Sequence, residues 1–130
     1  MTADLTPEEL ALLQSAFDHA RDGDIDALTE LLDAGVPANL TNSKGDTLLI
    51  LAAYHQHADL VRLLLARGAD HARVNDNGQT ALAAAVFRRQ EQIVRDLLAA
   101  GADPDLGPRS AVAIAEFFDL PDMLALLGRG

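Results

Sequence analysis

The sequence predicts an all-α fold, an α-solenoid of about four stacked helix–turn–helix units. The main observation is an internal repeat, in which the segment from Gly45 to Gly68 recurs in register as the segment from Gly78 to Gly101. A fixed period, in the range of about 20–50 residues, is typical of repeat arrays. The second observation is the composition, since 49% of the 130 residues are hydrophobic but only 4% are aromatic. Ala and Leu must therefore fill the interior, which suits closely packed helices.

The first forty residues predict two helices that form the first unit. Residues 6–9 have the order of a helix start, because Thr6 can cap free backbone N–H groups and Glu9 is placed to complete a capping box. Apolar residues then follow at helical spacing from Leu10 to Ala20. Gly23 breaks this helix, and a second helix is expected to end at Gly35.

Evenly spaced glycines mark the ends of the repeat units. Gly35, Gly68 and Gly101 are evenly spaced, and a glycine just past a helix can adopt the left-handed conformation that closes its end. The fourth unit is shorter, because residues 110–115 align with residues 80–85 only if the loop before them has lost part of its length. We expect an N-terminal tail of residues 1–5 and a single repeat domain over residues 6–130. Its units span about residues 8–41, 42–74, 75–106 and 107–130.

The two central units resemble the ankyrin repeat. The second unit has the pattern T-x-L-x-x-A-A from Thr47 to Ala53, then His57, then L-V-x-x-L-L-x-x-G-A-D from Leu60 to Asp70. The third unit repeats much of this pattern from Thr80 to Asp103. The resemblance covers about residues 8–127 and implies stacked helix–turn–helix units with a concave face that binds protein. It also implies that the imidazole of His57 bridges backbone groups of neighbouring loops.

The charge of the chain bears on its partners. Residues 1–40 carry nine acids and one base, so most of the net charge of −10 lies in the first unit. An acidic surface repels phosphate groups, and we therefore expect neither nucleic acid nor an anionic membrane as a partner. We expect a protein partner, and a basic region of that partner would be steered towards the first unit. The acidic surface also favours a monomer.

Other features bear on location and source. No apolar run is long enough to span a bilayer, and the N-terminus lacks the basic and apolar segments of a signal peptide. The absence of Cys fits a reducing compartment and excludes disulfides and thiol chemistry. We therefore expect a soluble, cytoplasmic protein. A high content of Asp, Arg and Ala with little Lys favours a bacterium with GC-rich DNA.

One cluster, His55, His57 and Asp59, has the residue types of a metal or acid–base site. Such a site needs at least three ligands that converge on one point. The resemblance instead makes His57 a bridge between loops, with His55 and Asp59 near helix ends, so we expect no metal and no cofactor. The sequence has no nucleophile elbow, phosphate loop or dinucleotide-binding fingerprint. We favour a non-enzymatic protein and keep a small metal-dependent enzyme with these three residues as an alternative.

Aromatic residues recur where the first helix of each unit is expected to end. Tyr54, Phe87 and Phe117 occupy equivalent places in three successive units. The ankyrin resemblance implies that these places line the concave face, together with the turn tips. Aromatic and Arg side chains concentrate the binding energy of protein interfaces. A second interpretation is that these aromatic rings stack on one another and only stabilise the helix ends.

The predicted function is a protein–protein interaction module that binds its partner on the concave face. The predicted contact residues are Arg21, Asp22, Lys44, Asp46, Tyr54, His55, Asn77, Gln79, Phe87, Arg88, Phe117 and Phe118. A related alternative is a regulatory or immunity-type inhibitor subunit of an enzyme, which would associate tightly and lastingly with its target.

Overall fold

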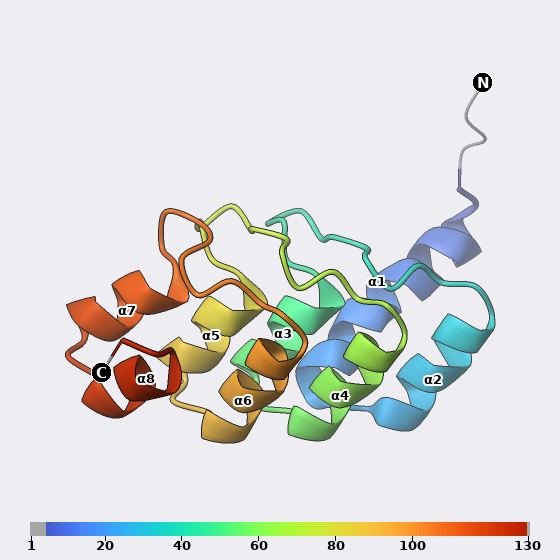
Figure 1. Ribbon diagram of the computed structural model, residues 1–130. Helices are drawn as coiled ribbons and strands as arrows, with labels where there is room; N and C mark the ends of the chain where they lie inside the picture. The colour runs from blue at the N-terminus through green and yellow to red at the C-terminus, as the bar shows by residue number, and fades with distance from the viewer. Residues whose placement is uncertain (1–4, 130) are drawn as a thin grey trace.

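The computed structural model describes residues 5–129, and these form eight helices in four hairpins (Figure 1). No strand forms within this range, where Thr41 and Thr47 make an isolated β-bridge. The helices are α1 (Pro7–Asp22), α2 (Ile25–Asp33), α3 (Leu48–Tyr54), α4 (Ala58–Ala66), α5 (Ala81–Phe87), α6 (Glu91–Ala99), α7 (Ala111–Phe117) and α8 (Pro121–Leu126). The predicted all-α solenoid is confirmed. Of the expected N-terminal tail, residues 1–4 lie outside the described residues.

The helices are arranged in two layers. One layer contains α1, α3, α5 and α7 side by side, and the other contains α2, α4, α6 and α8 (Figure 1). The main contacts pass from each hairpin to the next within a layer and between the two helices of a hairpin. The loops that join successive hairpins project from one edge of the stack (Figure 1). Each hairpin therefore completes its apolar environment with its neighbours, as expected for a solenoid.

The helices of the first layer begin at side-chain caps. Thr47 and Thr80 are buried, and their hydroxyl oxygens accept hydrogen bonds from the backbone N–H groups of Ile50 and Ala83 at 3.0 and 3.2 Å. Ser110 does the same at the start of α7. At the start of α1, Thr6 and Glu9 form the capping box that the sequence predicted. These caps satisfy donors that the first turn of a helix leaves free, and they fix where each helix starts.

The core consists of aliphatic side chains, with Ala where helices approach one another. Ala52, Ala85 and Ala115 occupy equivalent places in α3, α5 and α7, and all three are fully buried. Leucines such as Leu64 and Leu97 fill the space between the two layers. Small side chains in the first layer allow close helix packing, which explains why so few aromatic residues suffice.

The ends of the second-layer helices also follow the sequence prediction. Gly35, Gly68 and Gly101 all have positive φ angles, of 102°, 83° and 97°. The chain can therefore reverse directly into the next turn loop. No helix within residues 5–129 combines the length and the apolar character that crossing a membrane requires.

Candidate functional site

Two hollows lie next to each other on the surface formed by the first-layer helices and the turn tips, and each has a volume of about 400 Å³. The polar hollow is lined by Arg21, Asn42, Ser43, Lys44, Asp46, Ile50, Leu51, Tyr54, His55, Asn75, Asn77, Gln79 and Ala84. The apolar groove is lined by Gln79, Phe87, Pro108, Arg109, Ala113, Ile114, Phe117 and Phe118. Because Gln79 lines both, the two hollows form a continuous surface that extends from the end of α1 to α7.

Two asparagine-centred turns shape the edge of the polar hollow. The side-chain oxygen of Asn42 accepts hydrogen bonds from the backbone N–H groups of Lys44 and Asp46, at 2.9 and 3.0 Å. Asn75 repeats this arrangement one unit later with Asn77 and Gln79. The amide nitrogen of Asn75 also donates to the carboxylate of Asp46 at 2.7 Å, which ties the two turns together. The polar side chains at the rim are thus held by a connected set of hydrogen bonds.

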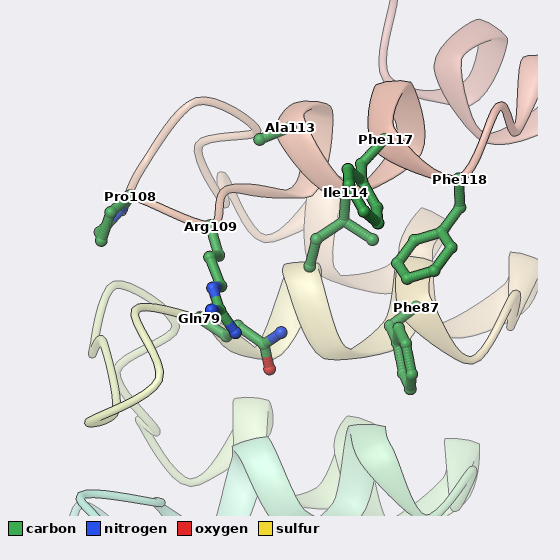
Figure 2. A pocket seen from close by; sticks show the side chains of 8 residues that line it. All are labelled: Gln79, Phe87, Pro108, Arg109, Ala113, Ile114, Phe117 and Phe118. Carbon is green, nitrogen blue, oxygen red and sulfur yellow. The ribbon is translucent and has the colours of Figure 1, made fainter.

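The apolar groove has a hydrocarbon wall and a polar end (Figure 2). In Figure 2, Phe117 lies beside Ile114, and Phe118 lies near Phe87. Arg109 extends from the loop before α7 towards Gln79, on the other side of Ile114. No carboxylate lines this groove within the described part of the chain.

An aromatic ladder, which we define as Tyr54, Phe87, Phe118 and Phe117, runs along the surface beside the hollows. Tyr54 and Phe87 stack with ring centres 6.1 Å apart and an interplanar angle of 18°. Phe87 then contacts Phe118 edge to face at 5.6 Å, and Phe118 contacts Phe117 at 4.9 Å. Distances in this range are favourable for aromatic pairs. The ladder therefore contributes to stability as well as forming a surface.

The ladder follows a regular rule. The residues that cap the C-termini of α5 and α7 each lie over the aromatic residue of the preceding unit. The guanidinium carbon of Arg88, the cap of α5, is 5.1 Å from the ring centre of Tyr54, and Phe118, the cap of α7, packs against Phe87. Within the described residues α7 is the last helix of its layer, so no such cap covers Phe117. Phe117 is consequently 82% exposed, whereas Phe87 and Phe118 are 39% and 44% exposed.

His55 lies at the rim of the polar hollow among positive groups. Its ring makes an edge-to-face contact with Tyr54 at 5.2 Å. Partial burial lowers the pKa of His55 below its ordinary value of 6.5, and the nearby His57, Arg21 and Arg88 lower it further, while Asp22 raises it by less. His55 therefore favours the neutral form, in which it can accept a hydrogen bond.

The structure does not bring His55, His57 and Asp59 together as a metal site. No group of three or more His, Cys, Asp or Glu side chains within residues 5–129 is arranged to hold a metal ion. The Nε2 atom of His57 instead lies 2.7 Å from the backbone carbonyl oxygen of Arg21, to which it donates. Asp59 forms an ion pair with Arg62. The bridging role of His57 that the resemblance implied is thus present in the structure.

Most of the predicted contact residues border one of the two hollows. The polar hollow gathers Arg21, Lys44, Asp46, Tyr54, His55, Asn77 and Gln79, and the apolar groove gathers Phe87, Phe117 and Phe118. Arg88 lies between them, over the ring of Tyr54. Asp22, the exposed last residue of α1, lines neither hollow.

Arg109 and Asn75 are two of the lining residues that were not predicted as contacts from the sequence. Arg109 precedes the cap Ser110, as Gln79 precedes the cap Thr80, so the repeat register contained the information needed to identify it. The shorter loop before α7 obscured this equivalence. Asn75 occupies the place of Asn42 one unit later, and its burial and double turn role mark it as a structural residue of the hollow.

Four stacked helix hairpins with hydroxyl caps, glycine ends and a loop-bridging histidine define a helical repeat protein. A family profile described as ankyrin repeats, three copies, matches residues 16–107. The chain belongs to the ankyrin repeat family, as the resemblance indicated. Ankyrin repeats generally mediate protein–protein interaction.

Two curated relatives match the chain over shorter segments. The ankyrin repeat protein PA3287 of Pseudomonas aeruginosa is 50% identical over 60 residues, which are 46% of this chain and 35% of that protein. The human ankyrin repeat domain-containing protein 29 is 44% identical over 64 residues, which are 48% of this chain and 21% of that protein. The match therefore spans about a third and a fifth of the length of these relatives.

Proposed function

We propose that this chain is a non-enzymatic binding module that holds a partner protein against its concave face, along the aromatic ladder and the two hollows. The observation that carries the proposal is the exposure of Phe117, Phe118 and Phe87 around an apolar groove. Exposed apolar side chains that gather in one place are typical of interaction sites. Aromatic side chains surrounded by a polar rim are also the usual centres of binding energy at protein interfaces.

The acidic first unit supports a second feature of the proposal. Residues 1–40 hold nine acids and one base, and the helices of this segment, α1 and α2, lie at the opposite end of the stack from α7 (Figure 1). A basic region of the partner would be attracted to this end, and the attraction would raise the association rate at low salt. We further propose that the module acts as a monomer in the cytoplasm, with residues 6–130 as one domain.

The experiment is affinity capture from a lysate of the native host, followed by quantitative mass spectrometry. The full chain, its Phe117→Ala variant and its Leu12→Ala variant would be compared. Leu12 is also an exposed apolar residue, but it lies on α1 and lines neither hollow, so the Leu12→Ala variant controls for nonspecific hydrophobic binding. We expect proteins that are captured by the original chain and by Leu12→Ala but are lost with Phe117→Ala. Identical capture by all three chains would refute binding at the ladder.

A further inference from the structure

The cations of this acid-rich chain are divided between two environments. The chain has twenty acids and ten Lys and Arg residues, all ten within the described range. Six of the ten form ion pairs with Asp or Glu: Arg21, Arg62, Arg67, Arg73, Arg95 and Arg129. The other four, Lys44, Arg88, Arg89 and Arg109, form no ion pair within residues 5–129. Three of these four lie on the surface that carries the hollows and the ladder, since Lys44 and Arg109 line the hollows and Arg88 covers Tyr54.

Arg109 has the most specific placement of the three. Its backbone N–H donates to the carbonyl oxygen of Gly78 at 3.0 Å, so the start of the side chain is fixed against the neighbouring turn. The guanidinium then lies at the polar end of the apolar groove, beside Gln79 and across from the aromatic wall. A guanidinium next to apolar surface and without an acidic neighbour is matched to a carboxylate, which it can bind through two parallel hydrogen bonds.

We propose that the apolar groove receives a segment of the partner protein in which an apolar side chain lies next to an Asp or Glu. The apolar side chain fills the space between Phe87, Ile114 and Phe118, and its neighbouring carboxylate pairs with Arg109. A volume of about 400 Å³ is enough for a large side chain. This inference rests on the proposed function and adds the chemistry of the partner to it.

The test is a selection of random twelve-residue peptides displayed on phage against the immobilised full chain. Selected peptides would be synthesised with a fluorophore, and their affinities would be measured by fluorescence anisotropy. We expect the selected sequences to share a Phe, Leu, Ile or Met within two residues of an Asp or Glu. We expect Arg109→Gln to weaken their binding about tenfold or more, because it removes a charge-assisted hydrogen-bonded pair. Changing the acid of the peptide to its amide should cause a similar loss, and the two losses should not add.

Arg129→Gln is the matched control, because Arg129 is also an exposed arginine but pairs with Asp105 and lines neither hollow. It should change the affinity less than about twofold. Circular dichroism would verify that both variants keep their helices.

Each other outcome has a defined meaning. Peptides that depend on Phe118 but not on Arg109 would overturn the acidic partner chemistry and leave the concave-face function intact. Peptides that bind the original chain, Phe118→Ala and Arg109→Gln with the same affinity would overturn both the acidic partner chemistry and the concave-face function. A selection that yields no binding peptide would also overturn both. The start of α1 also combines exposed apolar residues, Leu10 and Leu12, with acids, Glu8 and Glu9, so a second copy of the chain is the alternative occupant of the groove. Self-association in sedimentation velocity that rises with concentration and that Arg109→Gln abolishes would identify this second copy as the occupant and overturn the proposed partner segment.

Discussion

Truncation of Phe117 to Ala should lower the free energy of unfolding by less than the same truncation of Phe87. Phe117 is 82% exposed, so less than a fifth of its surface is buried. Full burial of a Phe side chain contributes about 1.5–3 kcal/mol, so the burial lost at Phe117 is worth about 0.5 kcal/mol or less. The edge-to-face contact with Phe118 adds about 0.5–1.5 kcal/mol, which makes the expected loss about 1–2 kcal/mol. The burial contribution is small because no cap residue covers Phe117 in the described part of the chain.

The expected loss at Phe87 is larger for two reasons. Phe87 is only 39% exposed, so its burial contributes about 1–2 kcal/mol. Its ring also packs against Tyr54 at 6.1 Å and Phe118 at 5.6 Å, and each aromatic pair adds about 0.5–1.5 kcal/mol. The expected loss for Phe87→Ala is then about 2–5 kcal/mol. Phe118→Ala should lose nearly as much, because Phe118 is 44% exposed and also makes two aromatic contacts.

The assay is equilibrium unfolding in urea, followed by circular dichroism, for the original chain and the three single variants. The slope of unfolding free energy against urea should remain constant, so that shifts of the midpoint report stability. If Phe117→Ala lost as much stability as Phe87→Ala, the ladder would be a purely structural feature and the reasoning about an uncovered Phe117 would be wrong. A stable Phe117→Ala chain, in contrast, provides a folded protein for the binding experiments.

Two further predictions concern the loops that join the helices. Gly23→Ala should destabilise the chain by more than the control Gly68→Ala. Both glycines have a left-handed backbone, which costs a non-glycine residue about 1–2 kcal/mol, but only at Gly23 would the new Cβ meet a neighbour, the His57 ring at 2.5 Å. The additional loss of unfolding free energy at Gly23, measured in urea, should disappear when His57 is also changed to Ala. The second prediction is that stability falls as pH drops below the ordinary His pKa of 6.5, because the lowered pKa of His55 means that the unfolded chain binds the proton first. His55→Gln should reduce this loss in thermal unfolding between pH 7 and 5, and an unchanged pH profile would contradict the assigned direction.

The architecture could be predicted from the sequence because it depends on local and periodic information. The capping residues Thr6, Thr47 and Thr80 act within one turn of their own helices, so their role is readable from the residues around them. The helix-ending glycines repeat for a similar reason, as their backbone conformation is set by the turn that follows. The bridge from His57 to the carbonyl of Arg21 spans two units, and only the family resemblance made it predictable.

The surface was harder to predict because side-chain direction is not fixed by repeat register. Tyr54, Phe87 and Phe117 are equivalent in the alignment, yet the contact from Phe87 continues to Phe118 and leaves Phe117 open to solvent. The residue that follows the aromatic position in the next unit decides which ring is covered. Phe118 lies over Phe87 in the same way as Arg88 lies over Tyr54. Arg109 was missed because the shortened loop before α7 hides its equivalence to Gln79.

The exposure of Phe117 also bears on why this end of the surface should bind a partner. On the fourth hairpin, Phe117 and Phe118 remain exposed, and no acidic residue within the described range lines the groove beside Arg109. The outward side of Phe117 and the unpaired guanidinium add little to the stability of the fold, and the exposed rings increase the risk of aggregation. A bound segment that covers the rings and neutralises the guanidinium accounts for both features at once, which is why we place the partner's apolar and acidic residues at this groove.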